Sequence, residues 1–357
     1  MSLTAISLFT GAMGLDLGLE KKGFDIRVAV DNHPAVFDTI RANRPLIPII
    51  KEDIRHVSTH AILKKASLQK GEATVVIGGP PCQPFSTAGR RLSLNDDRGA
   101  LVFEFIRVVR QAKPRFFVFE NVPGLRSATL RHISFYERIE KRPHEIPKES
   151  RLGQAFNILL RKFRMTKYTL TDEVLDASDY GAPQKRRRLF IIGARDGQHL
   201  QIKEQKRGST TLRQALRKLN ELSPEFLPFP PWGKYLKYIP PGGDWRDLPP
   251  KIQEEAMGRA FHSQGGRTGF FRRLRWDRPV PTLVSSPIRK ATCLAHPDGL
   301  RPLSIKEYAA IQGFPKCWKF SGSTKEKYEM IGNAVPLHLS SIVGKTIESA
   351  AVNGEIN

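Results

Sequence analysis

The feature that most constrains the fold is a regular alternation of short apolar runs and helical patterns over the first half of the 357-residue chain. The apolar runs are rich in β-branched residues and bounded by Gly and Pro, which is typical of buried strands. The expected strands are Ala5–Phe9, Ile26–Asp31, Thr74–Ile77, Arg115–Glu120, Tyr168–Leu175 and Leu189–Gly193. The expected helices are Leu15–Lys22, Pro34–Ala42, Leu101–Gln111 and Leu152–Phe163. This succession predicts an α/β fold, with a mostly parallel sheet covered by helices on both faces.

The second half of the chain has a different character. From about Arg195 to Thr292 it is rich in Pro, Gly, Trp, Tyr and Arg and has little periodicity. We interpret this block as a smaller, loop-rich domain that faces nucleic acid, with Trp232 and Trp245 in its own core. The predicted division is 1–194 for the larger domain, 195–300 for the smaller one and 301–357 for a return segment. Within the return segment, Ser304 and Glu307 form a capping box that opens a helix.

Charge and cysteine content limit the possible partners. Lys and Arg number 58 against 35 Asp and Glu, a formal charge of +23, which favours nucleic acid over an anionic membrane. The chain starts almost directly in a strand, which leaves no room for a signal peptide, and no apolar run is long enough to span a bilayer. Cys82, Cys293 and Cys317 lack zinc-ligand spacing, so we expect free thiols, no metal and a cytoplasmic location.

A stiff loop carrying a cysteine follows the third expected strand. The segment Gly78–Ser86 reads Gly-Gly-Pro-Pro-Cys-Gln-Pro-Phe-Ser. The two glycines let the backbone approach a ligand, and the prolines hold the chain extended. Cys82 is thereby presented at the carboxyl edge of the sheet, where open α/β proteins place their chemistry. A lone cysteine is more often an inert buried residue, so other motifs have to decide its role.

A Gly-rich turn indicates a nucleotide pocket at the same edge. The turn Phe9–Gly14 follows the first strand and opens a helix, so a ligand can lie against its backbone. Its spacing does not match G-x-G-x-x-G, which weakens a nicotinamide dehydrogenase interpretation. Asp31 ends the second strand, where it is placed to bind a ribose hydroxyl, and Asp53 follows the next apolar run. Together they predict an adenosine-bearing cofactor.

Seven motifs, in order along nearly the whole chain, resemble those of the DNA (cytosine-5)-methyltransferases of restriction–modification type. They are Phe9–Gly14, Gly78–Ser86, Asp97–Leu101, Glu120–Val122, Gln184–Arg188, Arg301–Pro315 and Gly332–Pro336. Each is weak alone, but the order is specific, with a variable block of Arg and aromatic residues before Arg301. Two positions depart from the family pattern, because Met13 stands where Gly is usual and Asp31 stands where Glu is usual.

The resemblance implies a Rossmann-like catalytic domain that binds S-adenosylmethionine, a target-recognition domain in the variable block, and a last helix that completes the catalytic domain. The implied cofactor contacts are Phe9, Gly11, Gly14, Asp31, Asp53, Pro81, Leu101, Asn333 and Val335. The expected DNA contacts are Ser86, Gln184, Arg267, Arg272, Arg273 and Arg275. The polar segment Gln83–Arg98 is expected to be a lid over a cytosine flipped out of the duplex.

The same resemblance implies a covalent mechanism. Cytosine C5 is a poor nucleophile, so a thiolate of Cys82 is expected to add to C6 and raise the electron density at C5. Glu120 is expected to hydrogen-bond or protonate N3, and Arg188 to hold O2. Arg186 and Arg188 would supply the cationic field that favours the thiolate. The base that removes the C5 proton is not identified; a bound water would serve.

Three other functions stay open on the sequence alone. They are a tRNA cytosine-5 methyltransferase, a DNA-binding module without catalysis, and a nicotinamide dehydrogenase. We expect a monomer associated with the nucleoid through its duplex DNA substrate, with a possible cognate restriction endonuclease. Neither the target sequence nor the role of the basic insertion at 126–151 can be read from these patterns.

Overall fold

The structure is a computed structural model that describes residues 2–81, 97–131, 133, 135–142, 144–262 and 268–353. Three residues with predicted roles, Cys82, Ser86 and Arg267, lie outside the described residues. Nearly all of the expected lid Gln83–Arg98 lies outside them too.

A seven-stranded sheet forms the centre of the large lobe, in the order β3-β2-β1-β4-β5-β8-β6. Its strands are β1 (Leu3–Leu8), β2 (Phe24–Asp31), β3 (Ile49–Lys51), β4 (Val75–Gly78), β5 (Phe116–Asn121), β6 (Thr169–Asp176) and β8 (Arg187–Ala194). Strands β1 to β5 pair in parallel, whereas β8 lies antiparallel between β5 and β6. The predicted α/β fold with a mostly parallel sheet is confirmed.

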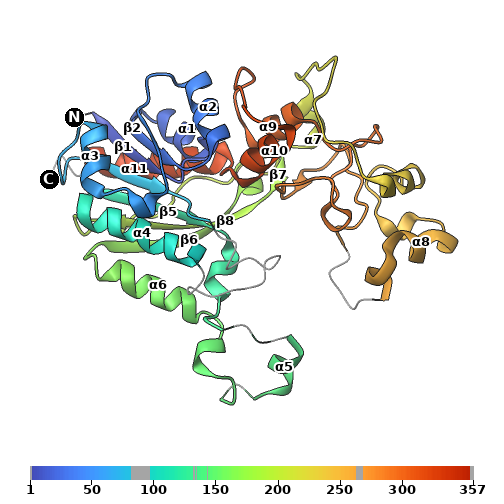
Figure 1. The fold of residues 1–357 in the computed structure, drawn as a ribbon, viewed down its shortest axis with the longest axis horizontal. Helices are drawn as coiled ribbons and strands as arrows, with labels where there is room; N and C mark the ends of the chain where they lie inside the picture. The colour runs from blue at the N-terminus through green and yellow to red at the C-terminus, as the bar shows by residue number, and fades with distance from the viewer. Residues whose placement is uncertain are drawn as a thin grey trace.

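Helices cover both faces of this sheet, as the alternating strand residues require (Figure 1). The helices are α1 (Gly14–Glu20), α2 (Pro34–Asn43), α3 (Thr59–Ala66), α4 (Asp97–Ala112), α5 (Phe135–Glu140), α6 (Gln154–Arg164), α7 (Leu212–Leu216), α8 (Pro250–Met257), α9 (Ile305–Gln312), α10 (Thr324–Asn333) and α11 (Leu337–Asn353). Phe117 and Phe119 of β5 pack with α3, α4 and α6, whereas Phe116 and Val118 pack with α1 and α11. This period-two pattern is the reason that one strand serves two cores.

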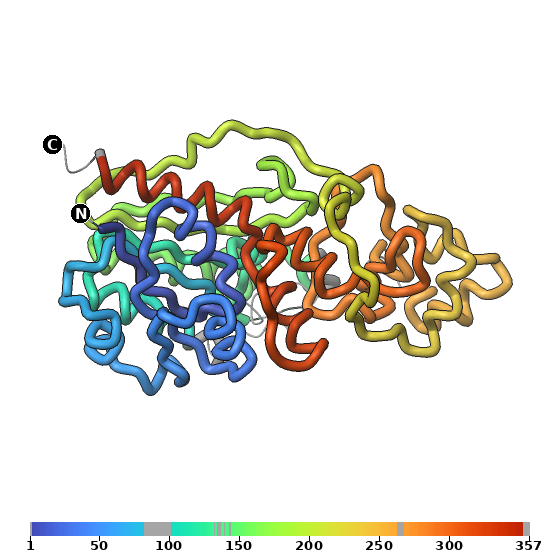
Figure 2. Tube along the Cα trace, turned by 90° about the horizontal axis from the view of Figure 1, so that it is seen from above, coloured from blue at the N-terminus to red at the C-terminus, as the bar shows by residue number. Residues whose placement is uncertain are grey.

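The C-terminal helix α11 lies directly against α1. Gly18 makes this approach possible, because a Cβ atom at that position would lie 2.3 Å or less from the backbone and side chain of Ser340. Seen from above, the segment that follows β8 runs back along α11 towards the small lobe (Figure 2). An ion pair of 2.8 Å between Glu204 and Lys345 joins the two segments.

The small lobe comprises the described residues of 212–303, and it has an aromatic core of its own. Trp245 and Phe271 are buried there, and Trp232 packs on them, as predicted for the two tryptophans. Helix α8 lies at the far end of this lobe (Figure 1). A two-stranded parallel pair, β7 (Gln184–Lys185) with β9 (Val280–Pro281), connects the lobe to the strand that enters the sheet.

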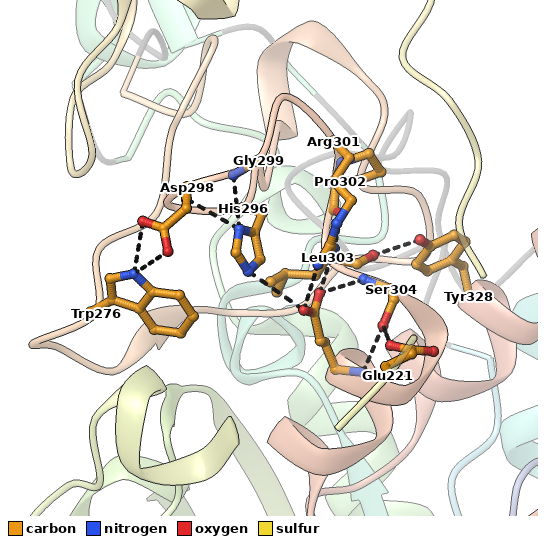
Figure 3. A network of polar contacts seen from close by, with 11 residues as sticks. Glu221, Trp276, His296, Asp298, Gly299, Arg301, Pro302, Leu303, Ser304 and Tyr328 are labelled. Carbon is orange, nitrogen blue, oxygen red and sulfur yellow. Dashed lines mark hydrogen bonds and ion pairs between the residues drawn. The ribbon is translucent and has the colours of Figure 1, made fainter. Parts of the chain in front are cut away.

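A polar network anchors the small lobe to α9 (Figure 3). The predicted capping box is present, because Ser304 accepts a hydrogen bond from the backbone of Glu307 and the Glu307 carboxylate accepts one from the backbone of Ser304. The same carboxylate binds Arg301 through two hydrogen bonds and lies 3.5 Å from His296. Asp298 accepts from the Trp276 indole. The capping carboxylate therefore also joins the two lobes.

The basic insertion at 126–151 leaves the carboxyl end of β5 and projects from the large lobe around α5 (Figure 1). Its base is held by an ion pair of 2.5 Å between Arg126 and Asp172 of β6. Across the described ranges, no helix combines the length and apolarity needed to cross a membrane.

Candidate active site

A cavity of about 430 Å³ opens at the carboxyl ends of the parallel strands. This volume is in the range that holds a small-molecule ligand. All of the predicted cofactor contacts line it, together with Glu120 and Arg188 from the predicted chemistry. The predicted contacts in the wall are Phe9, Gly11, Gly14, Asp31, Asp53, Pro81, Leu101, Asn333 and Val335. Residues far apart in the sequence therefore share one wall.

The Gly-rich turn is held in a left-handed conformation that exposes its backbone. Phe9, Gly11 and Met13 have φ angles of 54°, 53° and 65°, values at which residues other than Gly are strained. Glycine is therefore the natural residue at the Met13 position. Here the Met13 side chain is completely buried in the core between α1, α2 and the small lobe, and this burial offsets the strain.

Asp31 ties the turn to the end of β2. Its Oδ2 accepts a hydrogen bond of 2.9 Å from the Gly11 N–H, and its Oδ1 accepts one of 3.0 Å from the His33 N–H. Burial raises the pKa of this carboxyl group, and the backbone hydrogen bonds oppose that shift. Asp31 keeps further lone pairs for a ligand hydroxyl, since a carboxylate accepts up to about four hydrogen bonds.

Glu120 and Arg188 form a buried ion pair at the edge of the cavity. The distance from Arg188 Nε to Glu120 Oε1 is 2.8 Å, and the two side chains are only 11% and 10% exposed. They meet because β8 runs antiparallel to β5, which places Phe190 opposite Glu120 and Arg188 two residues further along. Burial raises the pKa of Glu120, and the positive charges of Arg188 and Arg186 oppose this shift. The carboxyl group is thus suited to hold a proton.

The backbone before Cys82 is clamped against the end of β5. Asn121 donates a hydrogen bond of 3.2 Å from Nδ2 to the Pro80 carbonyl, and its Oδ1 accepts one of 3.0 Å from the Val122 N–H. A Cβ atom on Gly79 would lie 2.7 Å from Glu120 Oε2, so any other residue there would have to displace this carboxylate. The role of Asn121 was missed in the sequence, although the residue belongs to the Glu120–Val122 motif.

Arg186 does not line the cavity, so the cationic field predicted for it would act there without contact to the base. The side chain is 1% exposed, and its guanidinium donates to the carbonyls of Leu283, Gly332 and Ala334. These carbonyls belong to the small lobe and to the end of α10. Arg186 is therefore a positioning residue that joins three distant segments, and it acts on Glu120 only through its charge.

The prediction that Gln184 contacts DNA has to be corrected. Its side chain is fully buried, donating to the Gln312 side chain and to the Ile311 carbonyl. A buried amide with these internal partners is not available to a phosphate in this structure. Within the basic run that contains it, Arg187 is exposed while Gln184 and Arg186 are buried.

The arginines of the small lobe differ in their surroundings. Arg273 donates to the carbonyls of Pro297 and Ile239, and Arg272 donates to the carbonyl of Thr268. Arg275 is exposed and forms an ion pair of 2.6 Å with Asp277. Arg273 therefore stabilises the lobe, whereas Arg275 lies at its surface. Within the described part of the chain, no group of three His, Cys, Asp or Glu side chains could hold a metal ion.

Replacing Arg186 by Met is expected to lower the free energy of unfolding by about 3–5 kcal/mol, because the buried carbonyls lose their charged donor. Urea unfolding measures this change. Arg187→Met is the matched control, since Arg187 is the exposed neighbour and should change stability by about 0.5 kcal/mol or less. Unchanged stability together with a large loss of kcat would instead indicate that Arg186 takes part directly in the reaction.

The chain is similar to known methyltransferases over nearly its whole length. The family model described as C-5 cytosine-specific DNA methylase matches residues 3–349. The type II methyltransferase M.PspPI of Psychrobacter sp. (strain TA137) is 38% identical, covering 97% of this chain and 79% of that protein. M.Eco47II of Escherichia coli is 37% identical, covering 96% and 78%.

The solved structures show the same fold. A protein described as a DNA modification methyltransferase encoded within a prophage (E. coli) has a TM-score of 0.67 at 24% identity, covering 98% of this chain and 100% of that one. These findings favour a DNA enzyme over the tRNA enzyme, the inactive binding module and the dehydrogenase. The chain belongs to the C-5 cytosine-specific DNA methylase family, and it is a DNA (cytosine-5)-methyltransferase that uses S-adenosylmethionine.

Proposed function

We propose that this enzyme methylates a cytosine that it flips out of a specific duplex sequence, with Cys82 as nucleophile and Glu120 and Arg188 on the opposite side of the base. The observation that supports this proposal is the buried Glu120–Arg188 pair, which borders the same cavity as the predicted cofactor contacts. Pro81, which directly precedes Cys82, also lines that cavity. A base entering here would therefore lie near both groups.

In the proposed reaction the Cys82 thiolate adds to C6, and the displaced electron pair moves towards N3 and O2. Protonated Glu120 donates to N3, and Arg188 stabilises the charge at O2. The bound cofactor would supply a methyl group on a positively charged sulfur. C5 would bond to that methyl as the carbon–sulfur bond breaks and leaves its electron pair on a neutral thioether, and N3 would return its proton to Glu120. A base then takes the C5 proton, and the electron pair of that bond expels the thiolate from C6. Cys82 and Glu120 are thereby restored.

The cavity fits the proposed cofactor. Gly11 of the left-handed turn lets the ligand lie against backbone that carries no Cβ atom, and Asp31 binds this residue at the end of β2. Among the charged side chains of the wall the carboxylates outnumber the cations, which suits a cofactor that carries a positive sulfur. The carboxylates that line the cavity are Asp16, Asp31, Glu52, Asp53, Glu120, Glu326 and Glu329.

The test of the whole proposal is expression in a host that lacks cytosine methylation, followed by bisulfite sequencing of its genome. The expected result is one short sequence protected at a single cytosine. No protected cytosine in cells that contain the folded protein would overturn the proposal. Purified protein offered duplex DNA and tRNA with labelled cofactor should label only the DNA.

Sequence preference is proposed to lie in the variable block. Exchange of Arg195–Thr292 for the corresponding block of a relative with another target should transfer that target to the chimaera. Bisulfite sequencing of DNA methylated by the chimaera measures the result. The control is an exchange that retains the native residues whose side chains pack on α9 and α10, because Leu212, Leu216 and Leu283 share one core with those helices. An unchanged target would place recognition elsewhere.

DNA binding is proposed to depend strongly on salt, because the chain carries a formal charge of +23. The logarithm of the binding constant should fall by roughly 0.9 per phosphate contacted for each tenfold increase in salt. The type II names of the relatives support a further proposal, a restriction–modification role with a cognate endonuclease. We also propose that the enzyme acts as a monomer on nucleoid DNA, which sedimentation of the free and DNA-bound protein would test.

A further inference from the structure

Asp16 is a buried carboxyl group for which the proposed mechanism has no use. It lies in the first turn of α1, is 1% exposed and forms part of the cavity wall. Its Oδ1 has no hydrogen-bond partner among the described residues. An isolated ionised carboxylate is costly to bury, so its presence here calls for a cation or for a bound proton.

Hydroxyl groups connect Asp16 to the Gly-rich turn. The Ser7 side chain hydrogen-bonds to Asp16, and the Thr10 hydroxyl donates to the Ser7 hydroxyl over 3.0 Å. The next residue along the turn, Gly11, is held by Asp31. The turn is therefore attached to two carboxyl groups, of which Asp31 accepts hydrogen bonds from the backbone of Gly11 and His33.

The charges around Asp16 give it no compensation. Glu20 on α1 and Asp31 on β2 are the charged groups that act on it most, and both are acids. Burial, with these two charges, raises the pKa of Asp16 to about 7. On the elements packed against α1, β4 has no titratable residue and Asp25 and Arg27 of β2 pair with each other. The titratable residues of α11 are His338, Lys345 and Glu348.

We propose that Asp16 is the cation-recognition group of the cofactor pocket: it holds a proton in the empty pocket and releases that proton to solvent when the positively charged cofactor binds. This inference rests on the placement of S-adenosylmethionine in the cavity. The positive cofactor favours the ionised carboxylate, so binding and loss of the proton are coupled. Through Ser7 and Thr10, the same carboxyl group orders the turn on which the cofactor lies.

The coupling has a defined sign. Below the pKa of free Asp16 the cofactor has to displace a bound proton, so its affinity falls as the pH falls. From pH 7.5 to pH 6 the dissociation constant should increase roughly eightfold. The range stops at pH 7.5 because the amino group of the cofactor itself titrates near pH 8. At pH 7 binding should release about half a proton.

Isothermal titration calorimetry of the purified full chain with S-adenosylmethionine tests this proposal. Titrations in buffers of different ionisation enthalpy count the protons released at pH 6, 7 and 7.5. Asp16→Asn keeps the shape of the side chain. Cofactor binding to this variant should release no proton linked to this site, and the dissociation constant should change less than twofold between pH 6 and pH 7.5. Glu20→Gln is the matched control: it removes a carboxylate one turn further along α1 that does not line the cavity. It should keep the proton release, centred at a somewhat lower pH, because loss of the Glu20 charge lowers the pKa of Asp16.

The possible outcomes distinguish the role of Asp16 from the placement of the cofactor in the cavity. Proton release at pH 7 that is equal in the wild type and in Asp16→Asn would overturn the role of Asp16. Binding by the wild type without proton release and with a constant affinity would overturn it as well, even where the Asn variant does not fold. Absence of binding at every pH would instead overturn the placement of the cofactor. Release in the wild type that is lost in Asp16→Asn and kept in Glu20→Gln supports the inference.

Discussion

Cys82→Ala is expected to lower turnover by more than about 10⁴-fold while cofactor and DNA binding persist. The reason is that no cysteine among the described residues lines the cavity and could replace Cys82 in the attack on C6. Removal of an enzymatic nucleophile costs this much in comparable covalent mechanisms. Methyl transfer from labelled cofactor measures turnover, and a DNA mobility assay measures binding. Cys317→Ala is the matched control, since Cys317 is an exposed free cysteine away from the cavity lining and should leave turnover unchanged.

The same nucleophile should be visible as a trapped adduct. Duplex DNA with 5-fluorocytosine at the target has no proton at C5, so the elimination step is blocked after methyl transfer. The wild type with cofactor should therefore form a complex that survives denaturing electrophoresis, and Cys82→Ala should form none. A wild type that methylates ordinary DNA but is not trapped would contradict attack at C6. Full turnover by Cys82→Ala would remove this residue from the chemistry altogether.

Glu120→Gln is expected to reduce kcat by about 10²–10⁴-fold, the usual contribution of a positioned acid and its hydrogen bond. The raised pKa of Glu120 allows it to hold a proton at a pH where an ordinary glutamic acid is ionised. Loss of that proton with rising pH should give the wild type an alkaline limb in its pH–kcat profile. The Gln variant cannot titrate, so its profile should lack that limb. Single-turnover methylation over a pH series measures both effects.

Glu173 offers a matched control for this substitution. It lies opposite Phe190 from β6, as Glu120 does from β5, and burial also raises its pKa. It does not line the cavity. Glu173→Gln should therefore keep kcat within about twofold, while the affinity of Glu120→Gln for the cofactor should stay near that of the wild type. Equal loss in both variants would indicate damage to the sheet instead of a role at the base.

Local sequence patterns were sufficient to predict most of the helices and strands. The strand that ends at Asp31 and the helix that begins at Ser304 were predicted because their signals, an apolar run and a capping box, lie within a few residues. β3 was missed because three residues are too few for a period to show. Helix α10 was missed although Ser323 and Glu326 form a second capping box, since its sequence is mostly polar.

The environments of Gln184 and Arg186 depend on partners that are distant in the sequence. Gln184 and Arg186 belong to a basic run that is typical of a solvated surface. Arg186 is buried because it meets the carbonyls of Gly332 and Ala334, which are left free where α10 ends. No local sequence pattern could predict this contact between Arg186 and the end of α10. Arg273 stays a predicted DNA contact, and its carbonyl partners, Ile239 and Pro297, are likewise distant in the sequence.

The sequence by itself determined the class of fold, the family and which motif residues line the cavity. Each motif follows its own strand, and parallel strands bring their carboxyl ends to one edge. The tertiary structure decided which charges act together. Arg188 meets Glu120 only because β8 enters the sheet antiparallel to β5, and Asp16 becomes a candidate cation site only because packing removes it from water. Strand direction and desolvation are properties of the assembled chain, and they decide the ionisation of these groups.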